Sequence, residues 1–440
     1  MSKKVLSWIF TAAVVLMSVT LTVGILFAGP SEAGANEVLS KAPQLKDKDG
    51  KLNDYVLNDT AKWVNDHFFG RQELISAHNK TVSTVFGVSA ADDVIFGSNG
   101  WLYYAPTLLD YTGVDALSRQ EILMAAHNLA LMQEYCQSQG REFAFMLAPN
   151  KNSLYPDNMP DYGVRNPSAN AKLLMAELDV LDVNYIDLFA AFGAQEEVLY
   201  FTHDSHWNSK GAALGADCIN AAFGVESNYF AADFSKAEAH QGDLYEMLYP
   251  ALSDRETNPV YGGNLEFAFA SKATKPDSIT LLTESDKDGS LLCYRDSFGN
   301  LLFPYLADSY GACRFSRSVN YDLTQEGEIV LIELVERNIS YLYTNLPVMP
   351  APQRDLPVLP ESSGTMVLES KSVKSPEGMI QITGMLPVNA DANAPIYVIC
   401  DGVAYEAFRQ AGSKFGAYVP AQAQAVACSQ NGTLQLYTAN

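Results

Sequence analysis

Hydrophobic and polar positions change rhythm several times along this chain, and each rhythm predicts a different kind of element. Between about residues 59 and 346, short apolar runs alternate with segments of helical spacing. The segment Glu142–Ala148 is almost entirely apolar, which is typical of a strand buried on both faces. Strands that alternate with helices indicate a parallel sheet covered by helices. The predicted fold class is therefore α/β, with three layers and a mostly parallel sheet.

The same pattern assigns the individual elements. Helices are expected over 59–85, 119–140, 168–181, 208–224 and 298–307, and strands over 142–148, 183–188, 290–294 and 328–334. Residues 96–104 should form a hairpin around a Gly/Asn turn. Ser118 and Glu121 have capping-box spacing, and Asn208 is placed to cap a later helix. Residues 228–288 break the alternation, so we expect loops or an insertion near the ligand-binding edge of the sheet.

The N-terminal pattern predicts export. Val5–Ala28 is an apolar run that follows two lysines, and it is long enough to cross a ~30 Å hydrocarbon layer. Positive charge before such a run keeps the N-terminus in the cytoplasm. We expect an uncleaved membrane anchor, and the alternative is a signal peptide cleaved near the small residues 33–35. Both interpretations place the remainder of the chain outside the cytoplasm.

The C-terminal part changes character again. Five prolines between Pro347 and Pro360 predict a linker over 347–364. Beyond it, alternating apolar runs separated by Gly, Pro and Asn predict a small β-sandwich over 365–440. With an anchor or signal peptide at 1–35 and a spacer with helices at 36–94, the central domain spans 95–346.

The net charge and the cysteine content indicate which classes of function are excluded or favoured. The formal net charge of −22 argues against nucleic-acid binding, which needs a basic surface to displace counterions from phosphates. The six cysteines are scattered and form no Cys-x-x-Cys pair. Cys400 with Cys428 is the one disulfide that we would predict, and free buried thiols are the alternative. We expect no cofactor.

Candidate chemistry gathers first in residues 201–211, where two of the six histidines lie. In an extended segment the side chains of Asp204 and His206 point to the same side, because alternate residues share a face. A carboxylate can then hold the far ring nitrogen of the imidazole and stabilise the imidazolium that forms when His206 acts as a base. This arrangement needs a nucleophile from elsewhere in the chain.

Ser297 is the strongest candidate for that nucleophile. It follows the apolar strand 290–294 and precedes a helix, so it lies at the carboxyl end of a strand and at a helix N-terminus. Backbone N–H groups and the helix dipole favour an oxyanion there. The alternative is that Ser297 only caps the helix. An Asp-x-His pair elsewhere in the chain favours the catalytic interpretation.

These motifs resemble a known family. Asp204-x-His206-Trp207 together with Asp296-Ser297-Phe298 is similar to the alginate O-acetyltransferase group, the relatives of AlgJ and AlgX, and to the neighbouring DHHW family. Supporting matches are Asp66-His67-Phe68 with Gly70-Arg71, Gly97 to Tyr103, Pro149-Asn150-Lys151 through Tyr155-Pro156, and Gly242-Asp243-Leu244, so the resemblance covers roughly 58–346.

The resemblance implies an SGNH-hydrolase-like domain over 95–346 and acetyl transfer onto an exported or cell-surface polysaccharide. It implies Ser297 as nucleophile, His206 as base and Asp204 as the residue that orients the base. Arg295 departs from the wider SGNH superfamily, which has Gly at the matching position. The expected partners are a polysaccharide acceptor, an acetyl donor (a membrane-bound acyl carrier protein is one candidate) and the membrane through the N-terminal anchor.

Further residues are candidates for substrate contacts. Lys151 or Asn150, after the strand 142–148, could add an oxyanion donor, with a solvated loop as the alternative. Arg295 could bind a sugar carboxylate, against a surface ion pair. Trp207 could stack on a sugar ring, against core packing. His240 could approach the site, and an ordinary loop histidine is the alternative.

Three other functions compete with acetyl transfer. A secreted esterase would use the same triad with water as the acyl acceptor. A metal site built from His203, Asp204 and His206 is a weaker alternative, because zinc usually takes three or four such ligands and no further His or Cys lies nearby in sequence. The third alternative is a non-catalytic polysaccharide-binding or assembly protein.

Overall fold

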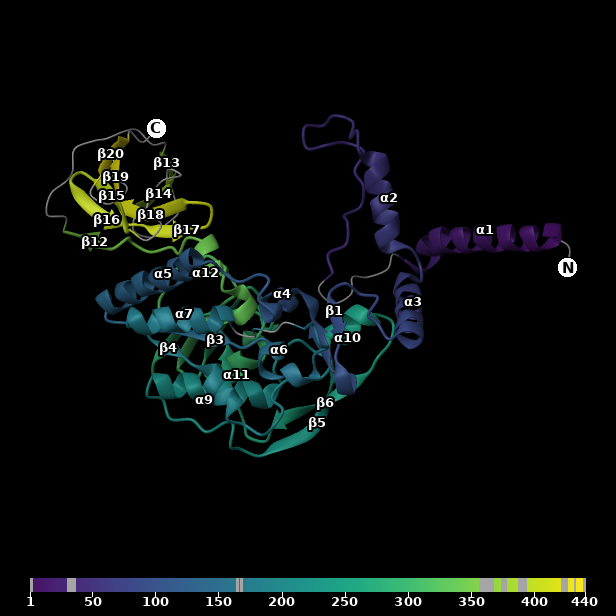
Figure 1. The fold of residues 1–440 in the computed structure, drawn as a ribbon, viewed down its shortest axis with the longest axis horizontal. Helices are drawn as coiled ribbons and strands as arrows, with labels where there is room; N and C mark the ends of the chain where they lie inside the picture. Colours follow the sequence, from purple (N-terminus) through teal and green to yellow (C-terminus); the bar gives the residue numbers. More distant parts are fainter. Residues whose placement is uncertain are drawn as a thin grey trace.

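The centre of the molecule is a seven-stranded sheet with helices on both faces (Figure 1). The computed structural model describes residues 3–29, 37–163, 166, 169–355, 368–372, 378–386, 394–420, 426–430 and 433–437. Across the sheet the strands are β4 (Tyr185–Ile186), β3 (Glu142–Ala148), β11 (Ile329–Val335), β9 (Ser290–Tyr294), β10 (Ala312–Ser316), β8 (Thr280–Glu284) and β7 (Ala268–Phe269). The strands from β4 to β10 pair in parallel, and β8 runs antiparallel to both neighbours. The predicted α/β fold with a mostly parallel sheet is confirmed.

Side chains of the central strands alternate between two cores. In β3, Phe143 and Phe145 pack toward α5 (Arg119–Ser138) and α7 (Ala169–Val180). Ala144 and Met146 face the other layer, which is built from α8 (Leu188–Gly193), α9 (Ser209–Ala222) and α11 (Gly299–Ser309). Because both faces are covered, both sets of side chains must be apolar, which explains the unbroken hydrophobic run.

Both predicted helix starts are confirmed. The Ser118 hydroxyl accepts a hydrogen bond from the Glu121 N–H at 3.2 Å, and the Ser118 N–H donates to Glu121 Oε2 at 2.8 Å. Asn208 Oδ1 accepts hydrogen bonds from the first free backbone N–H groups of α9, both at 3.0 Å. Caps of this kind stabilise a helix by about 1 kcal/mol each.

The segment 228–288 is more ordered than its sequence suggested. It contains a two-stranded antiparallel hairpin of β5 (Phe234–Gln241) and β6 (Arg255–Tyr261) with α10 (Asp243–Leu248) between them, as well as β7 and β8. The expectation of loops was therefore wrong, whereas the expectation of an insertion near the site fits the position of the hairpin. The strands escaped notice because charged and polar residues interrupt them.

Smaller elements complete this part of the fold. The predicted hairpin forms from β1 (Val94–Phe96) and β2 (Leu102–Tyr104). Short helices are α4 (Leu108–Thr112), α6 (Lys151–Leu154), α12 (Tyr341–Thr344) and the 3-10 turns η1 (Ser98–Gly100), η2 (Ala105–Thr107), η3 (Pro156–Asn158) and η4 (Glu336–Asn338).

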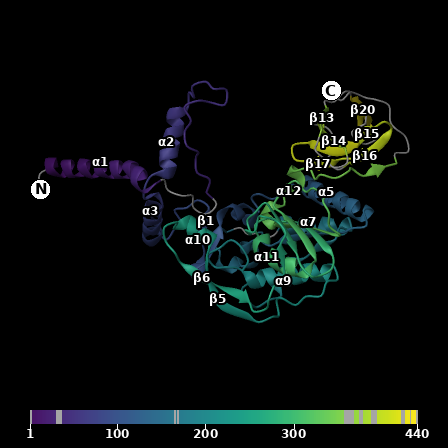
Figure 2. The same ribbon diagram turned by 180° about the vertical axis from the view of Figure 1, so that it is seen from behind.

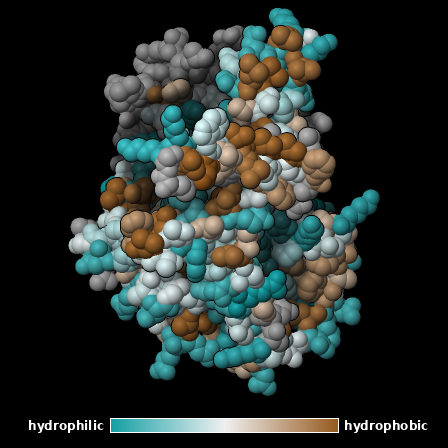
Figure 3. All heavy atoms as spheres, turned by 90° about the vertical axis from the view of Figure 1, so that its right-hand side faces the viewer, coloured by the Kyte–Doolittle hydropathy of each residue, from teal (hydrophilic) through white to brown (hydrophobic). Residues whose placement is uncertain are grey.

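Three helices precede the central domain. They are α1 (Lys3–Ala28), α2 (Val56–His67) and α3 (Arg71–Phe86). Trp8 and Phe10 of α1 are exposed, and hydrophobic patches lie among hydrophilic ones on the face from which α1 projects (Figure 3). Among the described residues, no helix combines the length and apolar character needed to cross a membrane. The membrane anchor stays a prediction, and the predicted cleavage site at 33–35 lies outside the described residues.

The C-terminal part consists of antiparallel sheets that lie beside α5 and α12 (Figure 2). One sheet has the order β12 (Gln353–Arg354), β16 (Val403–Glu406), β15 (Ile396–Cys400), β19 (Val426–Gln430) and β20 (Thr433–Tyr437). The other has the order β13 (Leu368–Ser372), β14 (Met379–Met385), β18 (Lys414–Pro420) and β17 (Phe408–Gln410). Buried residues of both sheets share one core. Half of the predicted linker, from 356 to 364, lies outside the described residues.

Two features of this part differ from expectation. Cys400 is a free, buried thiol, because the strand register pairs it with Val426 rather than Cys428, so the predicted disulfide is wrong. The start of the predicted linker forms β12, and its Arg354 donates hydrogen bonds to Glu134 of α5 and Glu406 of β16. These ion pairs join the C-terminal sheets to the central domain.

Candidate active site

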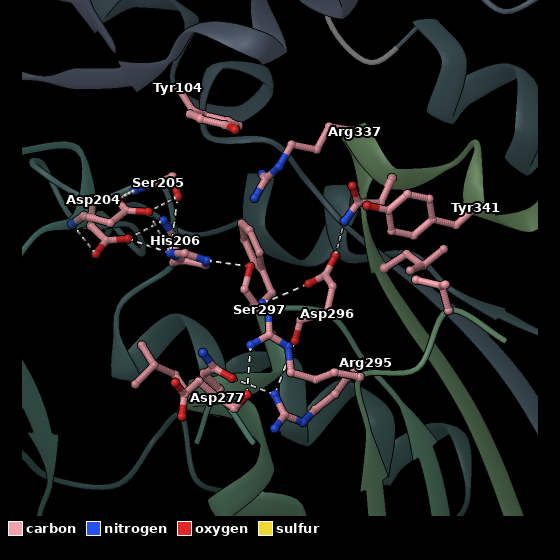
Figure 4. Close-up of a pocket in the computed structure, with 18 of the residues that line it drawn as sticks. Tyr104, Asp204, Ser205, His206, Asp277, Arg295, Asp296, Ser297, Arg337 and Tyr341 are labelled. Carbon is pink, nitrogen blue, oxygen red and sulfur yellow. Dashed lines mark hydrogen bonds and ion pairs between the residues drawn. The ribbon is translucent and has the colours of Figure 1, made fainter. Parts of the chain in front are cut away.

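Three polar side chains from two distant segments meet at the edge of the central sheet. His206 Nε2 lies 2.8 Å from Ser297 Oγ, and His206 Nδ1 lies 2.7 Å from Asp204 Oδ1 (Figure 4). Asp204 and His206 belong to the loop before α9, and Ser297 belongs to the turn between β9 and α11. Since an ionised carboxylate only accepts hydrogen bonds, His206 Nδ1 carries the proton and Nε2 is free to accept one from Ser297.

Asp204 accepts hydrogen bonds from several other residues of this cluster. Its second oxygen, Oδ2, accepts hydrogen bonds from His240 Nε2 at 2.8 Å and from the Asp243 N–H at 3.0 Å. The His240 ring stacks on Phe201, with centroids 3.9 Å apart. Two imidazoles and a helix N-terminus therefore hold one carboxylate, and its Oδ1 is left facing His206.

The charges in the cluster shift the pKa values in opposite directions. Burial alone would raise the pKa of Asp204, but the charges and hydrogen bonds of His206 and His240 hold it well below its ordinary value. Burial would lower the pKa of His206, yet Asp204 and then Asp243 raise it above 6.5. Burial, and then the charge of Asp204, raise the pKa of Asp243. Asp204 thus stays charged, and His206 is a stronger base than a free histidine.

The turn that carries Ser297 is fixed by the residue before it. Asp296 Oδ2 accepts hydrogen bonds from the Val335 N–H at 2.7 Å and from Asn338 Nδ2 at 2.8 Å, and Asp296 Oδ1 accepts one from the Phe298 N–H at 2.9 Å. Phe298, rather than Ser297, is the N-cap residue of α11. The Ser297 hydroxyl is therefore directed at His206 instead of capping the helix.

The three residues open onto a cavity of about 810 Å³. In the described part of the chain, its walls come from the loops after β9, β10 and β11 and from the β5 hairpin. Three arginines, Arg295, Arg317 and Arg337, bring positive charge to it, and Tyr104 and Tyr341 bring aromatic rings. A cavity of this size, with polar and aromatic walls at the strand ends, can admit a sugar residue or an acyl group.

The four residues expected to contact substrate all have internal partners, and Lys151 is the first of them. Lys151 is buried, and its Nζ donates hydrogen bonds to the carbonyl oxygens of Leu102, Thr202 and Asp204, at 2.7, 2.7 and 2.9 Å. Burial lowers its pKa to about 7. Neither Lys151 nor Asn150 is among the residues that line the cavity. Lys151 instead holds together the backbone segments that present Asp204.

Asn150 and Trp207 are likewise internal. Asn150 is fully buried, and its N–H donates a hydrogen bond to Glu336 Oε2 at 2.9 Å. Trp207 is also fully buried, and its indole N–H donates to the Phe298 carbonyl oxygen at 3.0 Å. That bond links the His206 loop directly to the Ser297 turn, so Trp207 aligns the two halves of the site from inside the core.

Arg295 lines the cavity, but its hydrogen bonds are internal. It donates from Nη1 to Asn300 Oδ1 at 2.6 Å and from Nη2 to the Pro276 carbonyl oxygen at 2.5 Å. The Arg295 side chain is buried and braces the start of α11. Among the described residues, no carboxylate forms an ion pair with Arg295, so the expected surface ion pair is not observed.

The sequence alone gave little indication of three residues of the site. His240 was only an open possibility, Asp243 entered through the resemblance alone, and Arg337 was not noticed. The positions of His240 and Arg337 depend on the β5 hairpin and on the turn after β11, and no local spacing reports such long-range contacts. For Asp243 a signal existed in the Gly242-Asp243 pair, since a side chain at position 242 would collide with the His203 carbonyl oxygen.

The proposed metal ligands are not arranged as expected. His203 Nδ1 is buried without a partner among the described residues, and its ring packs beside Tyr245. Asp204, His206 and Asp243 do bring ligand atoms within 4.8 Å of one another. To bind a cation, however, His206 Nδ1 would lose its proton and its hydrogen bond to Asp204. The donor set fits proton transfer better than metal binding.

Comparisons with known proteins identify the domain type. Residues 94–288 match the family model of the SGNH hydrolase-like domain of the acetyltransferase AlgX. This match includes Asp204 and His206 and ends before Ser297. No curated protein matches the chain.

Among solved structures, the chain is similar to PatB1 of Bacillus cereus, with 18% identity, a TM-score of 0.45, and 56% of this chain and 95% of that chain covered. The O-acetyltransferase domain of Pseudomonas putida AlgJ has 16% identity, a TM-score of 0.39, and covers 57% and 93%. A DHHW family protein from Eubacterium siraeum has 16% identity, a TM-score of 0.40, and covers 51% and 90%.

The family model confirms the resemblance predicted from Asp204-x-His206-Trp207 and its neighbouring motifs. The match lies within residues 94–288, and the α/β fold described above is of the SGNH hydrolase-like class.

Proposed function

We propose that this protein is an extracytoplasmic O-acetyltransferase that acts on an exported or cell-surface polysaccharide through an acyl-enzyme on Ser297. The observation that carries the proposal is the continuous hydrogen-bond chain from Asp204 through His206 to Ser297, with distances of 2.7 and 2.8 Å. The AlgX-type domain supports acetyl as the group transferred. The open cavity beside Ser297 supports a large acceptor.

In the first half of the reaction, Ser297 Oγ attacks the carbonyl carbon of an acetyl donor. The hydroxyl proton passes to His206 Nε2, and Asp204 stabilises the resulting imidazolium. The carbonyl electron pair moves onto oxygen, which the Ser297 N–H can stabilise. When the tetrahedral intermediate collapses, the donor's leaving group departs with the proton from His206, and Ser297 is left acetylated.

In the second half, His206 removes the proton of a sugar hydroxyl, which attacks the acetyl-serine. Collapse of this intermediate returns a proton to Ser297 and releases the acetylated sugar. Water in place of the sugar hydroxyl would give acetate, which is the esterase outcome. The difference between transferase and esterase therefore lies in which acceptor occupies the cavity.

The partition between these acceptors tests the proposal. The full chain is incubated with 4-nitrophenyl acetate and a panel of polysaccharide fragments, and acetylated fragments and free acetate are measured by mass spectrometry. We expect acetylated fragments to exceed free acetate for at least one acceptor, and the trapped acetyl group to map to Ser297. Acetate as the product with every acceptor would reassign the protein as an esterase.

The pH profile of catalysis follows from the charges around His206. Only neutral His206 can accept the serine proton, and Asp204 and Asp243 raise its pKa above 6.5 while Arg337 opposes them. We therefore expect kcat/KM to rise with pH through an apparent pKa above 6.5. Asp243→Asn removes one of the raising charges, so it should move this limb to lower pH. An unchanged limb in that variant would contradict the assignment.

His240 should act as a positioning residue through Asp204. In His240→Asn the Oδ2 hydrogen bond is lost, so the carboxylate can rotate and hold His206 less well. We expect kcat to fall about tenfold with a smaller change in KM, and the acidic limb of the pH profile to move. His127→Asn is a matched control, because His127 Nε2 lies 2.9 Å from Glu406 and His127 does not line the cavity. Equal effects of the two changes would indicate a purely structural role.

A further inference from the structure

A guanidinium without a carboxylate partner lies beside the nucleophile. Arg337 belongs to the turn η4 (Glu336–Asn338) directly after β11 and lines the cavity. Its side chain reaches from the β11 side toward His206 and Ser297 (Figure 4). No Asp or Glu of the described residues forms an ion pair with it. A cation in this position can bind an anionic group in the cavity.

The contacts of Arg337 fix its position but use few of its donors. Its guanidinium carbon lies 5.4 Å from the centres of the Tyr104 and Phe298 rings, so two aromatic side chains hold it. Its one hydrogen bond within the described residues is from Nη1 to Asn150 Oδ1 at 3.4 Å, which is long. A guanidinium has five N–H donors. Most of them thus remain available to a ligand in the cavity.

The other cavity arginines are placed differently. Arg295 donates to Asn300 Oδ1 and to the Pro276 and Asp296 carbonyl oxygens, so it serves the fold. Arg317 donates to the Asp277 carbonyl oxygen from the loop after β10. Arg337 packs on Phe298, the residue next to the nucleophile, and its charge acts on His206. Of the three arginines, Arg337 is therefore the one that packs beside Ser297 and acts on His206.

We propose that Arg337 is a further catalytic residue, whose guanidinium binds the acyl carbonyl oxygen opposite the Ser297 N–H. As Ser297 Oγ forms its bond to the carbonyl carbon, the carbonyl electron pair moves onto this oxygen, and the guanidinium donates hydrogen bonds to the oxyanion. The positive charge stays on Arg337 throughout, and the electron pair returns when the leaving group departs. The role rests on the proposed acyl-enzyme function and supplies the second oxyanion donor that this function needs.

The test compares Arg337→Gln with Arg119→Gln in the full chain, because Arg119 is an exposed arginine that pairs with Glu177 and does not line the cavity. Two quantities are measured: kcat/KM for 4-nitrophenyl acetate, which is a neutral ester, and the affinity for phenylboronic acid, which forms a tetrahedral anionic adduct with an active serine. We expect Arg337→Gln to lose about 100-fold in both, because both need a stabilised negative oxygen. Arg119→Gln should stay within about threefold of the parent in both.

Each other outcome is decisive. If Arg337→Gln folds and hydrolyses the neutral ester within about threefold of the parent, the inference is overturned. Loss of transfer to acidic sugars alone would then assign Arg337 to an acceptor carboxylate. If Arg337→Gln does not fold, Arg337→Lys is measured instead, with an expected loss of about tenfold and the same threshold for rejection. Retained activity in a Ser297→Ala variant would instead reject the proposed function itself.

Discussion

Ser297→Ala should reduce acetyl transfer and ester hydrolysis by at least about 10⁴-fold, because the reaction then loses its only covalent carrier. The Ser297 hydroxyl is the group that His206 Nε2 contacts at 2.8 Å, and alanine leaves the base without a nucleophile to activate. Residual turnover would come from binding and from the remaining oxyanion donors. Steady-state kinetics with 4-nitrophenyl acetate, together with intact-mass analysis for the acetyl-enzyme, give the measurement.

A hydroxyl elsewhere in the same cavity provides the control. Ser318 also lines the cavity, and its hydroxyl donates a hydrogen bond to the Asn320 carbonyl oxygen in an exposed turn. Ser318→Ala should therefore keep activity and the acetyl-enzyme signal near those of the parent. Comparable losses in the two variants would show that removal of any cavity hydroxyl disturbs the protein, and would leave Ser297 without a special role.

Asp204→Asn should lower kcat by roughly 10⁴-fold while the fold is kept. An asparagine has the shape of aspartate but offers an N–H₂ group and no charge. It cannot accept from His206 Nδ1, His240 Nε2 and the Asp243 N–H together, as Asp204 does. His206 would then favour the tautomer with its proton on Nε2, which faces Ser297 and can no longer accept the serine proton.

The companion variant for this change is Asp217→Asn. Asp217 also accepts several hydrogen bonds, from the Ser227 hydroxyl and from the Tyr229 and Phe230 N–H groups, but it does not line the cavity. Asp217→Asn should lower the midpoint of thermal unfolding without a large loss of kcat. If Asp204→Asn affects the thermal midpoint alone, as Asp217→Asn is expected to, Asp204 is structural rather than catalytic.

The strands at the centre of the sheet could be predicted well from the pattern. β3 and β9 largely coincide with their apolar runs, because burial on both faces favours apolar side chains. The strands β7, β8 and β10 lie toward one edge, where exposed positions accept charge, and Arg314 in the middle of β10 hides the alternation. Edge strands are defined by their neighbours more than by their own composition.

The residues of the candidate site also differ in how well the sequence predicts their positions. Asp204 and His206 could be paired from their spacing, because neighbours two apart in an extended segment share a side. Lys151 was harder to place, since its position after β3 suggested the cavity, whereas three backbone carbonyl groups draw its amine inward. His240 reaches Asp204 from 36 residues away through a hairpin. Contacts of this kind become visible only when the whole domain is folded.

The order of strands has a consequence for biosynthesis. β11 lies between β3 and β9, although it follows both in the sequence, and its last residue and the turn beyond it fix Asp296 beside the nucleophile. A nascent chain that stops before residue 329 would contain Asp204, His206 and Ser297 and yet lack the strand between β3 and β9. The surroundings of Ser297 would therefore be completed only after residues 329–338 have been translated.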